Sequence, residues 1–358
     1  MRVLIVRIGA MGDVLHAMPA VAALRQLHPE WFIGWAIEPR WSDLLQIAGD
    51  PNDLQQIEGR FDARALVDRW YSVAAGAWKR RPISLKTRSE VLSLRAVLRD
   101  ERFDVCVDMQ GAVKSAVVGR MAGAALFAGA ARPRERVARW LYGQKLDVIS
   151  THVVEQGCEL LGTAVCERLR PARVTLPMDE MHERWASQVV GDERFCLISA
   201  GGGWGSKIWP AERFGQVAAK LGRAGVPSVV NCSPQGSSEA ERVVETSEGF
   251  ARAVPCSVGQ LIALARRAAV VIGGDTGPLH LAAALERPVV GIYGPTDPAR
   301  NGPYGTRSRV LRDATSATSH KRVAVAEEGM LQIGVDDVLT AAMEMLGEVR
   351  GSRDKVRE

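Results

Sequence analysis

The chain has 358 residues, of which 47% are hydrophobic and 24% charged, as expected for a soluble globular protein with two domains. No apolar run approaches the ~20 residues of a membrane-spanning helix, and the short apolar start lacks a signal-peptide cleavage site. The six cysteines form no C-x-x-C pair. This excludes zinc-ribbon and thioredoxin-like sites and favours buried thiols in a reducing cytosol.

The net charge of +5 is concentrated in one segment. Residues 60–102 contain eleven Lys and Arg against five Asp and Glu. A charge run is often only a solvated face, but a concentrated positive charge also predicts an anionic partner. Nucleic acid, a phospholipid surface, and a phosphorylated or carboxylated substrate all remain open at this point.

The chain opens with a strand, a glycine-containing loop, a helix and a second strand. Residues 2–8 form a β-branched run, residues 14–28 place apolar side chains at helical spacing, and residues 32–37 predict the next strand. Pro19 should kink or restart the helix. This order is typical of a doubly wound parallel sheet.

The following segment is less regular. We expect loops or short helices over residues 60–90, a helix over 91–98, a buried strand over 104–109 and a helix near 137–142. We therefore assign residues 1–170 to an N-terminal Rossmann-like domain.

Residues 171–192 contain two prolines and predict a linker, after which strands and helices alternate again. Residues 193–334 predict a second Rossmann-like domain with a parallel sheet. Its elements are expected at 195–199, 211–224, 226–232, 238–248, 258–268, 270–273, 278–285 and 289–293. A last helix is expected over residues 335–349, within a final segment 335–358.

Gly9 and Gly12 follow the first strand, and Asp13 comes directly after them. Ligands of open α/β sheets bind at the carboxyl ends of the strands, so we expect Asp13 at the ligand edge. Its carboxylate either caps the helix or acts as a general base. The fingerprint G-x-G-x-x-G is absent, which disfavours an NAD-dependent oxidoreductase.

A second glycine-rich loop, residues 200–207, ends in Lys207. Glycines with a lysine at a strand end favour a phosphate cradle, and the ammonium suits a departing diphosphate. The alternative is a solvated surface lysine. Ile208 after the lysine excludes a Walker A loop.

A third glycine-rich loop, residues 273–280, follows a buried strand and opens a helix. Backbone N–H groups of its first turn could bind an anion. Asp275 could orient sugar hydroxyls or the loop itself, whereas His280 alone is more typical of a packed core residue. The turn-rich loop at 293–298 marks the next strand end along the same edge.

Together these segments resemble glycosyltransferase family 9, the ADP-heptose:lipopolysaccharide heptosyltransferases, and most of all its heptosyltransferase I type. The resemblance covers roughly residues 1–310. The motifs that carry it are VRIGAMGDVLHAMPA at 6–20, FDVCVDMQGAVKSAVVGR at 103–120, SKIWPAERF at 206–214, and GGDTGPLHLAAAL with PVVGIYGPTDP at 273–298.

The resemblance implies a GT-B fold, in which two Rossmann-like domains with parallel sheets face a central cleft and the C-terminal helix returns to the first domain. It also implies an inverting transfer that needs neither a metal nor another cofactor, and no D-x-D motif occurs. The stretch 200–207 is richer in glycine than the family's usual version.

Carried over residue by residue, the resemblance makes Asp13 the general base and Lys207 the diphosphate-binding lysine. It places donor-binding residues at Gly12, Gly203, Glu239, Asp275, Thr276, Gly277 and His280. It places acceptor-binding residues at Arg60, Lys114 and Arg120.

The implied reaction moves L-glycero-D-manno-heptose from ADP-heptose to the Kdo residue of Kdo-lipid A, an anionic acceptor. The implied location is the cytoplasmic face of the inner membrane, where the basic segment with Trp70, Tyr71 and Trp78 could contact the inner leaflet. The alternatives are heptosyltransferase II, a related transferase with another nucleotide-sugar, a nucleotide-binding oxidoreductase, and an anion-binding or nucleic-acid-binding module. We expect no nucleic-acid partner, because basic residues occur without a recognisable binding module.

Overall fold

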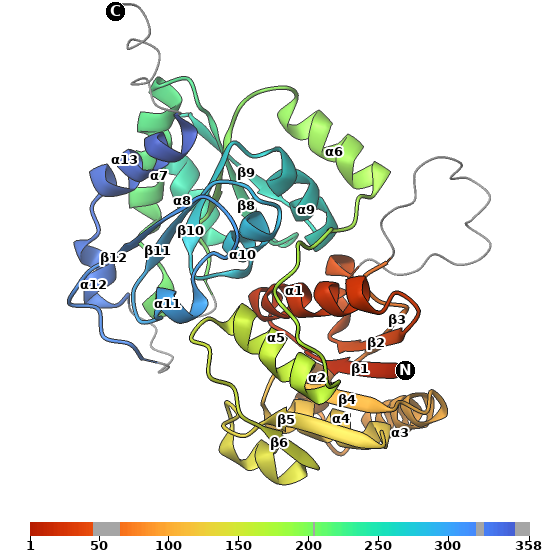
Figure 1. Ribbon diagram of the computed structural model, residues 1–358. Helices are drawn as coiled ribbons and strands as arrows, with labels where there is room; N and C mark the ends of the chain where they lie inside the picture. The colour runs from red at the N-terminus through yellow and green to blue at the C-terminus, as the bar shows by residue number, and fades with distance from the viewer. Residues whose placement is uncertain (46–64, 203–204, 320–325, 348–358) are drawn as a thin grey trace, which may run out of the picture. The chain divides into compact units, whose positions relative to one another are not determined.

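A computed structural model defines residues 1–45, 65–202, 205–319 and 326–347 of the chain. The chain divides into two units, Met1–Pro177 and Met178–Glu358, and each has its own sheet and core (Figure 1). Among the helices in these ranges, none combines the length and the apolarity that a bilayer span requires.

The first unit is built on a six-stranded parallel sheet with the order β3-β2-β1-β4-β5-β6. Residues 3–6 of the central strand are all buried, because helices cover both faces of a parallel sheet. The strands are β1 (Arg2–Val6), β2 (Phe32–Ile37), β3 (Arg69–Ser72), β4 (Val105–Asp108), β5 (Leu126–Ala130) and β6 (Gln144–Leu146).

Helices α1 (Met11–Leu27) and α5 (Val153–Ala164) pack together on one face of this sheet (Figure 1). The other face carries α3 (Leu85–Asp100), α4 (Val113–Ala122) and the 3-10 helix η3 (Arg136–Leu141), which pack in that order. Two short elements, the 3-10 helix η1 (Pro39–Leu44) and α2 (Ala75–Arg80), follow β2 and β3.

The structure corrects three expectations for the first unit. Helix α1 continues through Pro19 without restarting. Residues 60–90, expected to form loops or short helices, contain strand β3, and a 3-10 helix over 136–141 replaces the α-helix expected near 137–142. Strands β5 and β6 were not predicted; β6 has only three residues, and two of them are exposed.

The second unit repeats the same design, with the sheet order β12-β11-β10-β7-β8-β9. Numbered from its own first strand, each sheet has the doubly wound order 3-2-1-4-5-6. The strands are β7 (Cys196–Ser199), β8 (Ser228–Cys232), β9 (Ala251–Pro255), β10 (Val270–Gly274), β11 (Val289–Tyr293) and β12 (Ser308–Arg312).

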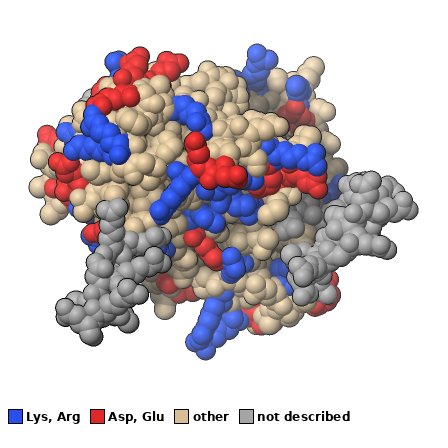
Figure 2. Space-filling view, turned by 90° about the horizontal axis from the view of Figure 1, so that it is seen from above, with Lys and Arg blue, Asp and Glu red and all other residues tan. Residues whose placement is uncertain are grey.

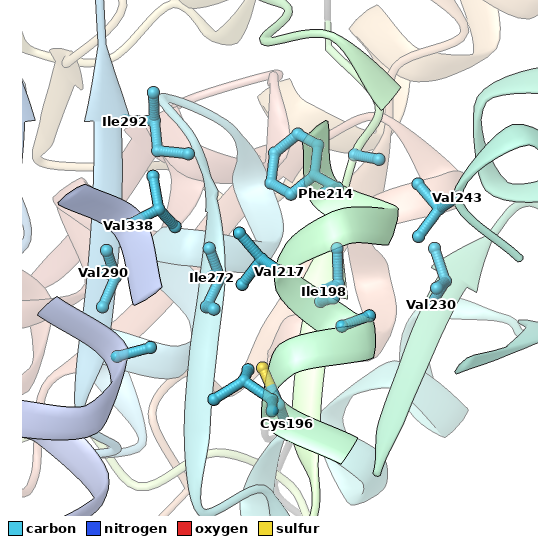
Figure 3. Close-up of a cluster of buried hydrophobic side chains, with 14 of the residues drawn as sticks. Cys196, Ile198, Phe214, Val217, Val230, Val243, Ile272, Val290, Ile292 and Val338 are labelled. Atoms are coloured by element: carbon cyan, nitrogen blue, oxygen red, sulfur yellow. The ribbon is translucent and has the colours of Figure 1, made fainter. Parts of the chain in front are cut away.

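Helices α7 (Ala211–Arg223), α8 (Ser238–Glu245) and α13 (Val335–Leu346) cover one face of the second sheet. In Figure 3, Phe214 and Val217 of α7 point at Ile198 and Ile272 of the sheet. The other face carries α6 (Glu180–Val190), α9 (Val258–Arg267) and α10 (Gly277–Ala284). The short elements are η4 (Gly205–Lys207), α11 (Pro298–Asn301) and α12 (Glu328–Gln332).

One segment expected within the linker is helical. Residues 180–190 form α6, which packs on α9 of the second unit. Helix α13 packs against α7 and β11. Its apolar side, which includes Val338, Ala342 and Leu346, is buried in the second core, and Figure 3 shows Val338 beside Val290 and Ile292. Residues 348–358 lie outside the described residues.

Charged side chains of both signs are interspersed on the face shown in Figure 2. Exposed ion pairs of the chain include Arg184–Glu180 at 2.7 Å and Lys220–Asp336 at 2.6 Å. Exposed pairs contribute only ~0–1 kcal/mol each, so the fold depends on the two apolar cores.

Candidate functional site

The strand order of each sheet changes direction beside its first strand, between β1 and β4 and between β7 and β10. Loops at such switch points form the ligand-binding edge of open α/β sheets. Asp13 follows β1, Lys207 follows β7 and Asp275 follows β10. The residues singled out in the sequence therefore lie on the loops where ligands are expected.

Asp13 lies in the first turn of α1, and its two carboxylate oxygens have different partners. One oxygen accepts a hydrogen bond from the Ala10 N–H at 3.2 Å, so the side chain does cap the helix. The other lies 2.9 Å from the guanidinium of Arg7. The side chain keeps 29% of its surface exposed, so a substrate hydroxyl can still reach it.

Arg7 connects the two loops at the first switch point. It donates to the backbone oxygen of Asp13 at 2.9 Å and to that of Met109, which follows β4. Gln110 adds a second connection, because its side-chain oxygen accepts from the Ile8 N–H at 2.8 Å. Sequence analysis missed Arg7; its one signal was a charge within an otherwise apolar strand run.

Gly9 allows the β1–α1 loop to pass close to Trp41 of η1. A side chain at position 9 would place its Cβ 2.7 Å from the indole nitrogen of Trp41, and the backbone φ of +156° also disfavours one. Gly12 lies in the first turn of α1 beside Asp13. The structure thus places Gly12, an expected donor residue, in the first unit with the candidate base.

A second carboxylate, Asp108, shapes the neighbouring loop. It is buried at the end of β4 and accepts hydrogen bonds from the backbone N–H groups of Gln110 and Gly111, at 2.9 and 3.1 Å, and from Ser115 and Tyr142, at 3.0 and 2.8 Å. Burial raises the pKa of Asp108, and these hydrogen bonds oppose the rise. We assign Asp108 to holding the loop.

The expected acceptor residues do not all lie together. Lys114 is exposed in the first turn of α4, at the strand-end edge. Arg120 lies in the last turn, ~9 Å further along the helix axis and towards the opposite edge of the sheet. Arg60 lies outside the described residues.

In the second unit, Lys207, Asp275 and His280 form a compact buried network. The Lys207 ammonium donates to one oxygen of Asp275, and the imidazole Nε2 of His280 lies 3.0 Å from the other. The three side chains are 12%, 7% and 4% exposed. Burial alone would raise the pKa of Asp275, but His280 and Lys207 hold it well below its usual range.

Glycine makes this network possible. Gly274 is so close to the loop after β7 that a Cβ there would lie 3.0 Å from the backbone oxygen of Lys207. The Lys207 and Asp275 loops can therefore touch. The alternative reading of Lys207 as a solvated surface lysine is wrong, whereas His280 is buried as a packed residue and also contacts Asp275.

The network lies beside the start of α10. Thr276 is the N-cap residue, Gly277 and Pro278 begin the helix, and His280 lies in the first turn. The first N–H groups of a helix have no partner within it and attract anions. A lysine after β7 and a helix start after the neighbouring strand β10 form an anion-binding arrangement.

Two buried hydroxyls lie on loops of the same edge. Ser206 immediately precedes Lys207, and Thr296 follows β11; they are 5% and 6% exposed. Within the described parts of the chain, neither hydroxyl has a hydrogen-bond partner. Buried hydroxyls of this kind are normally satisfied, so both favour a polar ligand at this edge.

The remaining donor candidate that can be placed is Glu239, in the first turn of α8 after β8. It accepts hydrogen bonds from the hydroxyls of Ser237 and Ser238, at 2.7 and 3.3 Å. The Ser237 bond is the main cause that lowers the pKa of Glu239. Glu239 therefore lies at the same strand-end edge as Lys207, whereas Gly203 is outside the described residues.

Two Rossmann-type units, each with a polar strand-end site, are the architecture of GT-B glycosyltransferases. Residues 91–331 match glycosyltransferase family 9 (heptosyltransferase), and the chain belongs to this family. The family and the fold class predicted from the sequence motifs are thereby confirmed, and the protein is a glycosyltransferase.

The relatives are similar over most of the chain. The "Lipopolysaccharide heptosyltransferase 1" of Escherichia coli K12 is 30% identical over 319 residues, which cover 87% of this chain and 93% of that protein. The structure of E. coli heptosyltransferase WaaC with ADP has a TM-score of 0.75 at 26% identity and covers 96% of this chain and 100% of its own. WaaC with ADP-2-deoxy-2-fluoro heptose gives 0.73 at 26% identity, covering 96% and 99%.

Proposed function

We propose that this glycosyltransferase moves L-glycero-D-manno-heptose from ADP-heptose to the Kdo residue of Kdo-lipid A, with inversion at the anomeric carbon. The observation that carries the proposal is the Lys207–Asp275–His280 network beside the start of α10. Relatives named as heptosyltransferases, among them one solved with ADP and with an ADP-heptose analogue, support ADP-heptose as the donor.

The donor diphosphate fits the charges of the second unit. The ammonium of Lys207 and the first N–H groups of α10 supply positive potential at one strand end. The hydroxyls of Ser206 and Thr296 can donate to phosphate oxygens. Asp275 fixes the position of Lys207, and Glu239 can accept hydrogen bonds from the ribose hydroxyls.

The reaction is a single displacement. The acceptor oxygen forms a bond to the anomeric carbon while the bond from that carbon to the diphosphate oxygen breaks, and its electron pair leaves with ADP. The carboxylate of Asp13 takes the proton of the attacking hydroxyl. Lys207 and the start of α10 stabilise the negative charge that develops on the departing diphosphate.

The acceptor and the location are part of the same proposal. Kdo carboxylates and lipid A phosphates are anionic, and the exposed Lys114 lies at the strand-end edge of the first unit, as does Asp13. An acceptor carried by a lipid requires the enzyme to work against a bilayer, here the cytoplasmic face of the inner membrane.

An assay of ADP release tests the function. Purified protein is incubated with ADP-heptose, with and without Kdo-lipid A, and the product is analysed for one added heptose. We expect ADP release that depends on the acceptor. Release only with an acceptor that already carries one heptose would assign the chain to the heptosyltransferase II alternative, and release only with another ADP-sugar would overturn the donor assignment.

A further inference from the structure

The turn between α2 and α3 exposes two large aliphatic side chains. Ile83 is 88% exposed and Leu85 is 82% exposed. The turn itself is held by hydrogen bonds, because Ser84 Oγ accepts from the Thr87 N–H at 3.0 Å and Thr87 Oγ1 donates to the backbone oxygen of Arg81 at 2.8 Å. A defined turn therefore presents Ile83 and Leu85 to solvent.

Cations surround these two side chains. Residues 75–89 contain five Lys and Arg and no Asp or Glu. All five are exposed: Lys79, Arg80, Arg81, Lys86 and Arg88. Lys86 lies 3.9 Å from Glu90 but keeps 86% of its side chain exposed, so this pair leaves most of the positive charge on the surface.

The same combination recurs on η3, which follows α3 and α4 on this face of the sheet. Val137 is 63% and Trp140 79% exposed, and the guanidinium of Arg139 lies 5.9 Å from the Trp140 ring centre. Residues 132–145 contain five Lys and Arg and a single acidic residue, Glu135. Its carboxylate accepts a hydrogen bond from a backbone N–H of α4 at 2.7 Å. We call residues 79–88 and 132–140 the basic face.

We infer that the basic face docks the enzyme on an anionic phospholipid bilayer. Exposed aliphatic and tryptophan side chains among lysines and arginines are typical of surfaces that lie in the membrane interface. The apolar side chains enter the acyl boundary, and the cations meet anionic headgroups. The inference rests on the proposed function, because a lipid-linked acceptor is what places the enzyme at a bilayer.

The basic face reaches the edge of the sheet where the candidate base lies. Helix α3 ends at Asp100, shortly before β4 begins, so its start and the α2–α3 turn lie towards the carboxyl ends of the strands. The Asp13 loop follows β1 at that edge. A bilayer on the basic face would thus bring the head of a lipid-linked acceptor towards Asp13.

The residues that make this surface differ from those expected in the sequence. Tyr71 is buried at 3% exposure, and the indole N–H of Trp78 donates to Glu90 at 2.8 Å. Both aromatic side chains therefore serve the fold. The most exposed apolar side chains in the described part of that segment are instead Ile83 and Leu85, and Trp140 lies outside the basic segment 60–102.

Flotation with vesicles tests the inference. Full-length protein is mixed with vesicles of phosphatidylcholine, or of phosphatidylcholine with about 30% phosphatidylglycerol, without acceptor lipid. We expect flotation with the anionic vesicles only, and release at about 0.5 M salt. The double variant Ile83→Ser/Leu85→Ser should lower the fraction of protein bound to vesicles about tenfold, because these side chains enter the bilayer. Both are exposed, so their removal should not affect the fold.

A matched control has two exposed apolar side chains on the second unit. Met178→Ser/Met181→Ser, at residues 69% and 73% exposed, should bind vesicles like the unchanged protein. If both double variants float equally, or if flotation does not depend on the fraction of anionic lipid, then the inference that the basic face binds the bilayer is wrong. Stronger binding to duplex DNA than to anionic vesicles would overturn it in favour of nucleic acid.

A soluble acceptor separates this inference from the proposed function. With Kdo-lipid A stripped of its acyl chains, the Ile83→Ser/Leu85→Ser variant should release ADP at the unchanged rate. On acceptor embedded in vesicles, the same variant should be about tenfold slower. A protein that floats with vesicles but releases no ADP would contradict the proposed function alone, whereas an active protein that never floats would contradict the basic face alone.

Discussion

Each unit places a carboxylate after a strand at its switch point, and the two carboxylates are surrounded differently. Asp13 is 29% exposed and contacts one cation, Arg7. Asp275 is 7% exposed and lies between two cationic or proton-sharing partners, Lys207 and His280. The loop after the first strand thus holds a carboxylate that can receive a proton in one unit, and the loop after the fourth strand holds one that fixes a neighbouring lysine in the other.

The largest effect is expected from Asp13→Asn. The amide can still accept the Ala10 hydrogen bond but cannot take a proton, so kcat should fall about 10³-fold, the range of a lost general base. ADP affinity and the melting temperature should change little. ADP release and calorimetric ADP binding measure the two quantities.

The control for this variant is Asp179→Asn, because Asp179 also caps a helix start: it is the N-cap residue of α6 and accepts from the His182 N–H at 2.9 Å. It should keep full activity. If Asp13→Asn also keeps its rate, then capping is the whole role of Asp13 and the comparison of the two carboxylates fails.

The next effect is expected from Lys207→Ala. Loss of the ammonium should lower kcat about 10²-fold by removing charge stabilisation from the leaving diphosphate. It also leaves Asp275 buried without one of its partners, which should cost about 3 kcal/mol of unfolding free energy. Urea unfolding and ADP-release kinetics test both parts.

Lys220→Ala is the matched control for stability, because Lys220 pairs with Asp336 on the surface, with 41% and 83% of the side chains exposed. It should change the unfolding free energy by less than about 0.5 kcal/mol. If both lysine variants change the unfolding free energy equally, then burial does not make the Lys207–Asp275 pair more stabilising than the exposed Lys220–Asp336 pair.

A third, smaller effect is expected in acid. The pKa of Asp275 lies below its ordinary value of 3.8 in the folded protein, so the folded state favours the charged carboxylate. The resulting stabilisation is present above pH ~4 and is lost as the pH falls further. Between about pH 5 and pH 2, the melting temperature should therefore fall more steeply with decreasing pH for the unchanged protein than for Asp275→Asn. If the melting temperatures of both proteins fall in parallel, then the folded state does not favour the charged carboxylate of Asp275.

The smallest effect is expected from Glu239→Gln. The serine partners of Glu239 can still bond the amide, and only contacts with the donor ribose are weakened. The donor KM should rise about fivefold, equivalent to one hydrogen bond, with kcat unchanged. Glu245→Gln, at the other end of α8, should leave KM as it was. A change in kcat instead of KM would place Glu239 at the reacting atoms.

The elements that the sequence predicted share a local signal. Strands β7, β10 and β11 are apolar runs that end in glycine-rich or turn-rich loops, and the structure has them where they were expected. Strands β3 and β6 escaped prediction because they lie at sheet edges and carry exposed polar residues. Their pairing depends on neighbours far away in the chain.

The candidate site likewise combines features that the local sequence shows with contacts that it does not show. Glycines near Asp13, Lys207 and Asp275 marked the three loops, and a close approach of a neighbouring segment requires glycine at Gly9 and Gly274. The contacts that set the roles of these side chains join distant residues: 68 positions separate Lys207 from Asp275, and 102 separate Arg7 from Met109. No local pattern contains such pairs.

The position of α13 has a consequence for synthesis on the ribosome. The first unit ends at Pro177, so all of its strands are available while the rest of the chain is still being translated. The second core needs Val338 and Leu346 of α13, which are translated after all six strands of the second sheet. The two halves are thus completed at different times, and a nascent second half must keep an apolar sheet face uncovered until α13 has emerged from the ribosome.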